Sequence, residues 1–365
     1  MKATLSDVCN IIAGYAFKGK DFNGDGYPVI KITDIQPPYA STISCSHVNL
    51  SSYDTSKLTK YLVSRNDFVI AMTGATIGKI GRITSGLAYM NQRVAKFEIN
   101  DSTTKAFVYQ LLLSDSFTTH INSNIDSQSA QPNISAGSIG RFEFDLPTKD
   151  QQRHIVDILG SIDEKIEKLE KENKEFQKLC LSQFKLYFNN KEKVALNKLA
   201  TVTMGQSPDG NTINESSGTI FYQGRTDFGF RYPEVRLFTS APKRMAKEDD
   251  ILLSVRAPVG DVNVAMENCC IGRGLAAISS NYKHFVFYSL LAQQSDFDVY
   301  NNTGTIFGSI NREALLSFGV PASDMIDVVK FDSLAAIIDS KIKQNVIESI
   351  KLKELKALHL QKFFG

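Results

Sequence analysis

A glycine-rich stretch in the first half of the chain contains residue types that could bind a phosphate. GATIGK, from Gly74 to Lys79, is one residue shorter than the phosphate-binding pattern GxxxxGK, and Ile80 stands where that pattern needs Ser or Thr. Glycine permits the backbone dihedral angles that tight turns require. We therefore interpret this stretch as a turn between two strands rather than as a nucleotide site.

Two further stretches are close to fragments of catalytic motifs. QPPYA, from Gln36 to Ala40, differs from the Asn/Asp-Pro-Pro-Tyr/Phe signature of adenine methyltransferases at its first position, and no glycine-rich cofactor motif accompanies it. EDD, from Glu248 to Asp250, precedes a β-rich run and lacks the further ligands that metal-assisted hydrolysis needs. We expect EDD to form a solvated turn, and we expect no catalytic centre and no cofactor in this chain.

Cysteine, histidine and hydropathy patterns argue against other classes of site. The sequence has no CxxC pair and no HExxH motif, so we expect reduced, buried thiols and neither a disulfide scaffold nor a metal site. It has no run of about 18 apolar residues and no signal-peptide pattern at its start, so we expect a cytoplasmic protein. The cysteines are Cys9, Cys45, Cys180, Cys269 and Cys270.

The arginines are unevenly distributed. The net charge is only +2, which does not by itself indicate nucleic acid as a partner. Arginine is, however, the side chain best suited to bidentate contact with guanine edges and phosphates. Taken alone, these residues are better explained as solvated surface charges balanced by nearby acids. Seven arginines lie between residues 192 and 324, namely Arg225, Arg231, Arg236, Arg244, Arg256, Arg273 and Arg312.

The chain contains an internal repeat. LSDVCNIIAGYAFKG, starting at Leu5, aligns with LNKLATVTMGQSPDG, starting at Leu196, and NDFVIAMTGATIGKI aligns with DDILLSVRAPVGDVN. The order of such matches is kept over nearly the whole chain, which predicts two copies of one unit. Further aligned pairs are Asp34 and Asp227, Gly78 and Gly260, Phe107 and Phe285, Asp163 and Asp339, and Phe188 and Phe364.

Each copy is predicted to be a globular α+β domain followed by a long helix. Runs such as PVIKITDI, DFVIAMT and DILLSV are rich in β-branched and aromatic residues and predict a mostly antiparallel, irregular sheet. Single helices are predicted around TKAFVYQLLLSDSFTTHI and FVFYSLLAQQSDF. Thr148 with Gln151 forms a capping-box pattern, and Ser323 or Asp324 is the cap expected for the second long helix. The predicted segments are domains at 1–147 and 191–321 and helices at 148–190 and 322–365.

The two long helices are predicted to pair. The central helix has a heptad seam, and the C-terminal helix offers a partner stripe, so an antiparallel coiled coil is the simplest arrangement. About 34 helical residues span roughly 50 Å, whereas one turn of B-DNA is about 34–36 Å. On the helices alone, a scaffold or dimerisation coiled coil without nucleic acid is the favoured explanation. The seam comprises Ile155, Leu159, Ile162, Ile166, Leu169, Asn173, Phe176, Cys180, Gln183 and Tyr187, and the stripe Phe331, Leu334, Ile338, Ile342, Ile350, Leu355 and Leu358.

The layout as a whole resembles the specificity subunit of type I restriction-modification systems. The resemblance lies in the two domain openings, in the KITDI stretch, in the NDFVIAMTGATIGKIG and DDILLSVRAPVGDVN pair, and in the stretches that lead into each long helix. It covers essentially the whole chain. One departure is VPASDMIDVV, which lacks the Glu/Gln-rich start usual for such a helix.

The resemblance implies two target recognition domains that each read one half of a split double-stranded DNA sequence. It implies that the helices act as a ruler and dock two modification subunits, which bind S-adenosylmethionine and methylate adenine. Restriction subunits, the motor-nucleases that use ATP and magnesium, would complete the complex, and this subunit would have no catalytic role. The alternative is a coiled-coil adaptor that binds only proteins.

DNA contacts are expected from loops between strands, where basic side chains reach phosphates and base edges. The candidates in the first domain are Lys31, Gln36, Lys79, Arg82 and Arg93, and those in the second are Arg225, Arg231, Arg236, Arg244 and Arg256.

Overall fold

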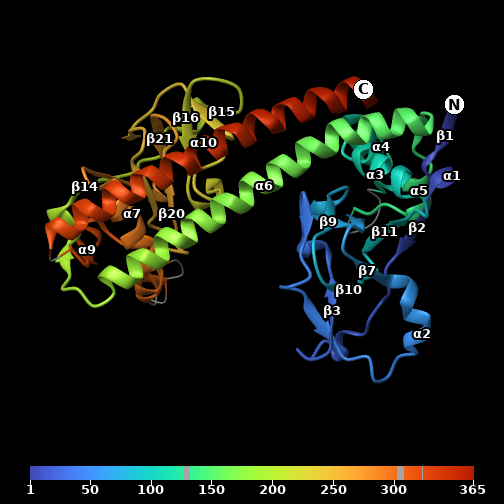
Figure 1. The fold of residues 1–365 in the computed structure, drawn as a ribbon, viewed down its shortest axis with the longest axis horizontal. Helices are drawn as coiled ribbons and strands as arrows, with labels where there is room; N and C mark the ends of the chain where they lie inside the picture. Colours follow the sequence, from blue (N-terminus) through green and yellow to red (C-terminus); the bar gives the residue numbers. More distant parts are fainter. Residues whose placement is uncertain (127–131, 302–307, 323) are drawn as a thin grey trace. The chain divides into compact units, whose positions relative to one another are not determined.

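The computed structural model describes residues 1–126, 132–301, 308–322 and 324–365. The chain forms two compact units (Figure 1): unit 1 comprises Met1–Glu167 and Ser349–Gly365, and unit 2 comprises Lys168–Glu348. Each unit therefore contains one globular part and pieces of both long helices, whereas the sequence predicted the helices as separate segments. No helix within the described ranges is long and apolar enough to cross a membrane.

Unit 1 contains a six-stranded and a four-stranded sheet, and a separate pair formed by β1 (Lys2–Thr4) and β12 (Glu143–Asp145). The order in the larger sheet is β2 (Asn10–Ala13), β11 (Val94–Glu98), β8 (Phe68–Ala71), β9 (Ile80–Ile83), β5 (Tyr39–Ala40) and β4 (Ile35–Gln36). The order in the smaller sheet is β6 (Ser46–Val48), β3 (Tyr27–Ile30), β10 (Leu87–Met90) and β7 (Leu62–Ser64).

Strand β8 separates two apolar layers of unit 1. Phe68 and Ile70 pack in one buried cluster with Phe107 of helix α3 (Ser102–Leu111), whereas Val69 and Ala71 pack in another cluster, which belongs to the smaller sheet. Because successive side chains of a strand point to opposite faces, a continuous apolar run is required where both faces are covered.

The single helix predicted after β11 is two helices. Ser114 ends the first one, because its hydroxyl accepts a hydrogen bond from the Phe117 amide (3.2 Å) and so caps α4 (Asp115–Ser123). Other short helices of this unit are α1 (Leu5–Val8), α2 (Thr55–Leu58) and α5 (Ala136–Gly140).

Unit 2 repeats this architecture. Its four-stranded sheet has the order β14 (Ala200–Met204), β22 (Leu275–Ser280), β19 (Ile251–Ser254) and β20 (Val262–Val264). Its five-stranded sheet has the order β15 (Ile213–Asn214), β17 (Leu237–Thr239), β16 (Thr219–Tyr222), β21 (Cys269–Ile271) and β18 (Met245–Ala246). Strand β13 (Val194–Ala195) pairs with β23 (Gly319–Val320), and the helices are α7 (Lys283–Ala292), α8 (Asp298–Asn301) and α9 (Arg312–Leu316).

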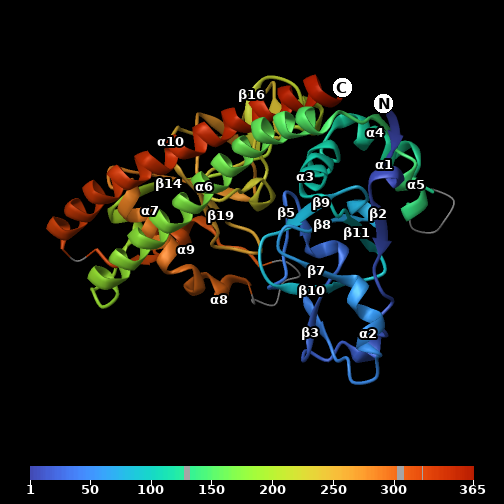
Figure 2. The same cartoon turned by 45° about the vertical axis from the view of Figure 1, so that its right-hand side comes forward.

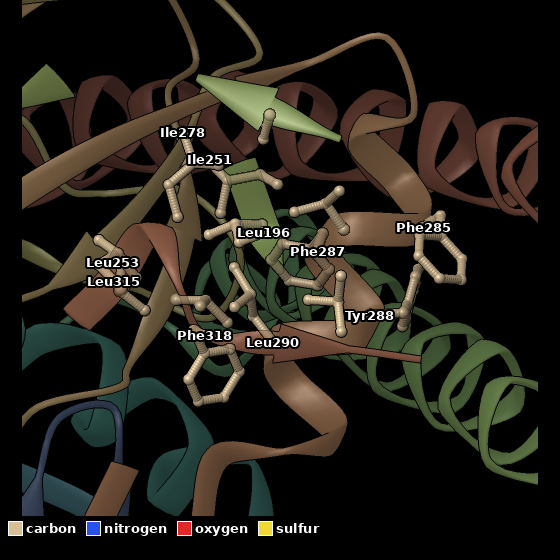
Figure 3. Packing of buried hydrophobic residues seen from close by; sticks show 14 of the residues in the cluster. Leu196, Ile251, Leu253, Ile278, Phe285, Phe287, Tyr288, Leu290, Leu315 and Phe318 are labelled. Carbon is tan, nitrogen blue, oxygen red and sulfur yellow. The ribbon is translucent and has the colours of Figure 1, made fainter. Parts of the chain in front are cut away.

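The core of unit 2 is a single large aromatic and aliphatic cluster. Ile251 and Leu253 of β19 point into it, together with Phe285 and Leu290 of α7 and Phe318 before β23 (Figure 3). Leu252, between the first two, packs instead in the cluster of the five-stranded sheet. Strand β19 therefore separates two layers as β8 does in unit 1, and the predicted α+β class is confirmed.

Details of the backbone support the predicted repeat. Gly78 and Gly260 have positive φ angles of 81° and 102° in the hairpins β8–β9 and β19–β20. Asn66 and Asp249, just before β8 and β19, are the non-glycine residues with positive φ among those described, at 70° and 66°. Most strand pairs are antiparallel as predicted, but β3 with β10, β5 with β9 and β16 with β21 are parallel.

The two long helices, α6 (Lys149–Phe188) and α10 (Met325–Phe364), each contain 40 residues. The capping box of α6 is confirmed, since the Thr148 amide donates to Gln151 Oε1 (3.0 Å) and the Gln151 amide donates to Thr148 Oγ1 (3.3 Å). Asp324 caps α10 by accepting from the Ile326 amide (2.9 Å), while Ser323 lies outside the described residues.

In each unit the segments of α6 and α10 run antiparallel, side by side in both views (Figures 1 and 2). In unit 1, Lys356 Nζ donates to Asp163 Oδ1 (2.7 Å), and His154 contacts Phe363. In unit 2, Asn345 Nδ2 donates to Asn173 Oδ1 (3.0 Å), and Phe331 packs on Phe184 (5.3 Å between ring centroids).

The predicted seam of α6 is correct as far as Cys180; beyond it Gln183 is half-buried, and Tyr187 is wrong. Tyr187 is 58% exposed, whereas Phe184 and Phe188 are buried against α7 and α10. A straight helix repeats every 3.6 residues rather than 3.5, so its buried face drifts from a heptad pattern. Of the other predicted positions, Phe176 is half-buried, and the buried ones are Ile155, Leu159, Ile162, Ile166, Leu169 and Asn173.

The predicted stripe of α10 is largely wrong. Phe331 and Ile342 are buried and Ile338 is half-buried, but Leu334, Ile350, Leu355 and Leu358 are all exposed. The buried face instead includes the polar residues Asp339, Asn345 and Ser349. An apolar pattern could not reveal a face whose buried positions include polar residues, and several apolar side chains of α10 are left exposed.

Candidate nucleic-acid interface

Three predicted contacts of unit 1 come from strand ends that are joined by backbone hydrogen bonds. The Ala71 amide donates to the Lys79 carbonyl (3.0 Å), and the Met72 amide donates to the Arg93 carbonyl (2.9 Å). The Asn91 amide donates to the carbonyl of Ile30, beside Lys31 (3.0 Å). Lys79 and Arg93 are exposed. These connections gather three basic residues at one edge of the unit, where the loops leave the strands.

GATIGK is confirmed as a turn between strands, and QPPYA lies in a hairpin. Gly74–Thr76 is a short 3₁₀ helix between β8 and β9, and Gln36 pairs with Tyr39 in the hairpin β4–β5. Gln36 is exposed. The Lys31 ammonium donates to Ser46 Oγ (3.0 Å) and lies 4.1 Å from the centroid of the Phe22 ring. Lys31 is thus half-buried and already engaged, whereas Gln36 presents its amide to solvent.

Arg231 is not a DNA contact. Its side chain is 2% exposed and forms an ion pair with Asp339 of α10, with the guanidinium 3.5 Å from the centroid of the Phe287 ring. His284 Nδ1 (2.6 Å) and the Tyr288 hydroxyl (2.9 Å) also contact Asp339. Burial raises the pKa of Tyr288 well above its usual value. The sequence predicted a surface arginine, but Arg231 instead connects the globular part of unit 2 to helix α10.

Arg82 makes a similar set of contacts in unit 1. It forms an ion pair with Glu167 of α6 and lies over the ring of Tyr109 (5.8 Å), the residue that the repeat aligns with Phe287. Asp163, which the repeat aligns with Asp339, accepts from Gln110 Nε2 (2.8 Å) as well as from Lys356. The Arg82 side chain is 28% exposed. Both units therefore attach a long helix through an arginine over a ring, but only unit 2 buries the pair.

Two other arginines of unit 2 are held by acids and remain half-exposed. Arg225 forms an ion pair with Asp261 and Arg236 with Asp227, and the arginine side chains are 54% and 51% exposed. Asp227 is buried and also accepts from the Gln223 amide (2.7 Å). These contacts fix the direction of two guanidinium groups at the surface.

The other two predicted contacts of unit 2 have exposed side chains. Arg244 and Arg256, both predicted, are exposed and take part in the fold through their main chains. Arg273, which was not among the predicted contacts, is exposed on the turn between β21 and β22. The turn closes with a hydrogen bond from the Leu275 amide to the Gly272 carbonyl (2.9 Å), as the Val94 amide closes the turn of Arg93 in unit 1. Extending the repeat alignment to this turn would have identified Arg273.

The EDD stretch is a turn but not a solvated one. Asp250 is buried and accepts from Ser279 Oγ (2.5 Å), and Asp249 pairs with Lys283 (2.7 Å) and Lys343 (3.1 Å). Burial raises the pKa of Asp249, but the hydrogen bonds from the two lysines outweigh it and lower the pKa overall. Among the residues the structure describes, no group of three or more His, Cys, Asp or Glu could hold a metal ion.

The chain is similar to known proteins of one class. Residues 1–177 match the family model of the type I restriction modification DNA specificity domain. A protein of Methanocaldococcus jannaschii named as the type I restriction enzyme MjaX specificity subunit is 31% identical over 258 residues. That match spans 63% of this chain and 60% of the relative, so it covers less than two thirds of the relative's length.

Two further matches extend over more of the chain. The EcoBI type I restriction enzyme specificity subunit of Escherichia coli is 24% identical over 331 residues, which span 78% of this chain and 67% of that protein. The crystal structure of a type I restriction-modification S subunit from M. genitalium has the same fold, with a TM-score of 0.58 and 16% identity, covering 100% of this chain and 96% of that one. The chain is thus similar in sequence to type I restriction enzyme specificity subunits over much of its length, and it has the fold of an S subunit.

Proposed function

We propose that this chain is the non-catalytic DNA-specificity subunit of a type I restriction-modification complex, in which each unit reads one half of a bipartite site in double-stranded DNA. The observation that carries the proposal is the equivalence of the two units, each with exposed basic side chains on corresponding turns: Arg93 in unit 1 and Arg273 in unit 2. Phosphate contacts position such domains and base contacts give the sequence preference. The proposed contacts are Lys31, Gln36, Lys79 and Arg93 of unit 1, and Arg225, Arg236, Arg244, Arg256 and Arg273 of unit 2.

The helices α6 and α10 would act as an antiparallel coiled-coil spacer between the half-sites. At 1.5 Å per residue, a helix of 40 residues spans roughly 60 Å, which exceeds one turn of B-DNA. The buried Asn173–Asn345 hydrogen bond lies in the middle of this pairing. A polar pair at a buried seam position specifies register, so we propose that it sets the alignment of the two helices.

The uncovered apolar side chains of the helices are proposed to dock the modification subunits. In unit 2, a groove of about 240 Å³ is lined by Leu179, Phe331, Leu334 and Ile338, among others. Ile337, outside this groove, is 72% exposed, and Leu358 in unit 1 is 64% exposed. Contiguous exposed apolar surface marks protein interaction sites. Since each unit has such a surface, two modification subunits would bind, and these would supply S-adenosylmethionine-dependent adenine methylation.

In the complete complex, restriction subunits would add an ATP- and magnesium-dependent motor-nuclease. The rival function is an adaptor that binds only proteins, which the same exposed apolar side chains would also serve.

Methylation sequencing distinguishes a DNA-specificity subunit from an adaptor that binds only proteins. We expect the full chain, co-expressed with its modification subunit, to direct adenine methylation to one bipartite sequence. Methylation without any sequence preference would contradict the proposal and favour the adaptor.

A further inference from the structure

The units present their cations to solvent in different ways. In unit 2, Arg225 and Arg236 are each bound by a carboxylate. In unit 1, Lys79 and Arg93 form no ion pair within the described residues. An arginine whose guanidinium is already oriented loses less freedom on binding a base edge than one that moves freely, because pre-organisation removes part of the ordering cost.

Asp261 is itself held in place. One carboxylate oxygen binds Nε of Arg225 and the other binds Nε2 of Gln294. Its amide donates to Ser254 Oγ (2.9 Å), and its carbonyl accepts from the Ser254 amide (2.9 Å). The preceding Gly260 has a φ of +102°, and a Cβ there would come within 2.6 Å of buried Phe297. The hairpin that carries Asp261 is therefore fixed by both backbone geometry and packing.

The terminal amino groups of Arg225 remain available for contact with a base. Only Nε is engaged by Asp261, so the two terminal amino groups, Nη1 and Nη2, have no partner among the described residues. The side chain is 54% exposed, and it projects from the 3₁₀ turn Arg225–Asp227. A guanidinium with a free fork is the group that binds guanine O6 and N7 in the major groove. Arg236 differs, because both Nε and Nη2 bind Asp227 and leave one amino group.

Unit 1 has the opposite charge at the equivalent position. In the β8–β9 hairpin the Ala71 amide donates to the Lys79 carbonyl (3.0 Å), just as the Ser254 amide donates to the Asp261 carbonyl in the β19–β20 hairpin (2.9 Å). Lysine cannot orient a neighbouring arginine. As a compact point charge, its ammonium suits phosphate contact instead.

We infer that Asp261 is a positioning residue for sequence recognition: it orients Arg225 so that the guanidinium fork reads a guanine in the half-site of unit 2, with Arg236 contacting the neighbouring phosphate. This inference rests on the proposed function. It assigns guanine recognition to unit 2 through a held arginine, and backbone contact to the corresponding hairpin of unit 1.

The test is selection from randomised double-stranded DNA by the full chain co-purified with its modification subunit, followed by sequencing. Wild type should select a guanine at one position of one half-site. Asp261→Asn should reduce the preference at that position alone by about tenfold, within the range for loss of one good bidentate contact. Arg225→Lys should do the same while leaving the salt dependence of binding unchanged, because the charge is kept.

The matched control is Asp296→Asn, which also removes one carboxylate from an ion pair of unit 2 (Lys193, 3.0 Å) and should leave the selected sequence unchanged. Circular dichroism melting of each variant confirms that it is folded. The inference is overturned if Asp261→Asn selects the wild-type sequence with wild-type strength. It is also overturned if Arg225→Ala weakens binding to all sequences equally, which would make Arg225 a phosphate contact. A wild-type protein that selects no sequence would instead remove the proposed function itself.

Discussion

The two units share an architecture but differ in how they hold their charges. Unit 1 contacts α6 through a partly exposed Arg82–Glu167 ion pair and has an exposed lysine, Lys79, in its hairpin. Unit 2 contacts α10 through a buried Arg231–Asp339 ion pair, and the hairpin residue equivalent to Lys79 is Asp261. A duplicated fold thus keeps the attachment of the helices while its surface chemistry diverges. The burial and the partners of each basic residue in such a domain must therefore be known before that residue is interpreted as a DNA contact.

The largest expected effect is on stability, and it should differ between the two ion pairs that hold the long helices. Arg231→Ala leaves Asp339 buried without its cation, which costs about 3–5 kcal/mol of stability in unit 2. Arg82→Ala removes a pair whose side chains are 28% and 38% exposed, and should cost about 1 kcal/mol or less. Urea unfolding of both variants measures the difference. Equal destabilisation would mean that the burial of the pair does not decide its contribution.

The second comparison tests the ends of the helices. Phe188 of α6 packs on Phe285 (5.1 Å) in unit 2, and Phe364 of α10 packs on Phe107 (5.6 Å) in unit 1, so each helix ends on the globular part of the other repeat copy. Phe188→Ala should cost about 3–5 kcal/mol, as expected for a buried aromatic ring.

Tyr187→Ala is the matched control, because that ring is 58% exposed, and it should change the unfolding free energy by less than about 0.5 kcal/mol. If the Tyr187 variant were as unstable as the Phe188 variant, this result would support the heptad prediction that Tyr187 belongs to the seam of α6.

That comparison also shows what could be predicted from sequence. The repeat, the fold class, the capping box at Thr148 and the first half of the α6 seam followed from spacing and residue type. The end of the seam did not, because packing on α7 turns Phe184 and Phe188 inward. The buried face of α10 could not be predicted for another reason. Asp339 and Asn345 are buried by contacts with residues that lie far away in the sequence.

The same limit applies to the candidate interface. Arg231 and Arg225 are the same residue type, six positions apart, and only tertiary contacts distinguish the buried one from the exposed one. The sequence predicted that these loops carry basic side chains, but it could not show that Asp261 and Asp227 orient two of them.

A third prediction compares the exposed apolar surfaces of the helices. Ile337→Lys in unit 2 and Leu358→Lys in unit 1 should each reduce the amount of modification subunit that co-purifies with the chain, because a charge would have to be desolvated at the contact. Loss of about half of the bound subunit from each single variant would indicate one subunit per unit. Lys341→Ala, also exposed on α10, is the control and should bind normally. Normal binding by both Lys variants would place the docking surface elsewhere.

The smallest expected effect concerns the caps of α3 and α7. Asp101 caps α3 of unit 1 through the Thr104 amide (2.7 Å), and its hydrogen bond from Lys149 lowers its pKa from 3.8 to about 2. Because this folded-state pKa lies below the unfolded value, the contribution is present above about pH 4 and is lost as the pH falls toward 2.

In unit 2, α7 is instead capped by Asp332 of α10, which accepts from the Phe285 amide (2.9 Å). Asp101→Asn should therefore flatten the acid dependence of the thermal midpoint between pH 4 and pH 2, measured by calorimetry. An unchanged acid dependence would show that this carboxylate is not a source of it.

The measurement that tests the central claim most directly is methylation sequencing with the full chain, the modification subunit and two matched pairs of substitutions. Lys79→Ala with Arg93→Ala alters only unit 1, and Arg225→Ala with Arg236→Ala alters only unit 2. Each pair should relax or change the methylated sequence in one half-site and leave the other half and the spacing unchanged. Changes in both halves from either pair, or no change from both pairs, would contradict the account that each unit reads its own half of the site.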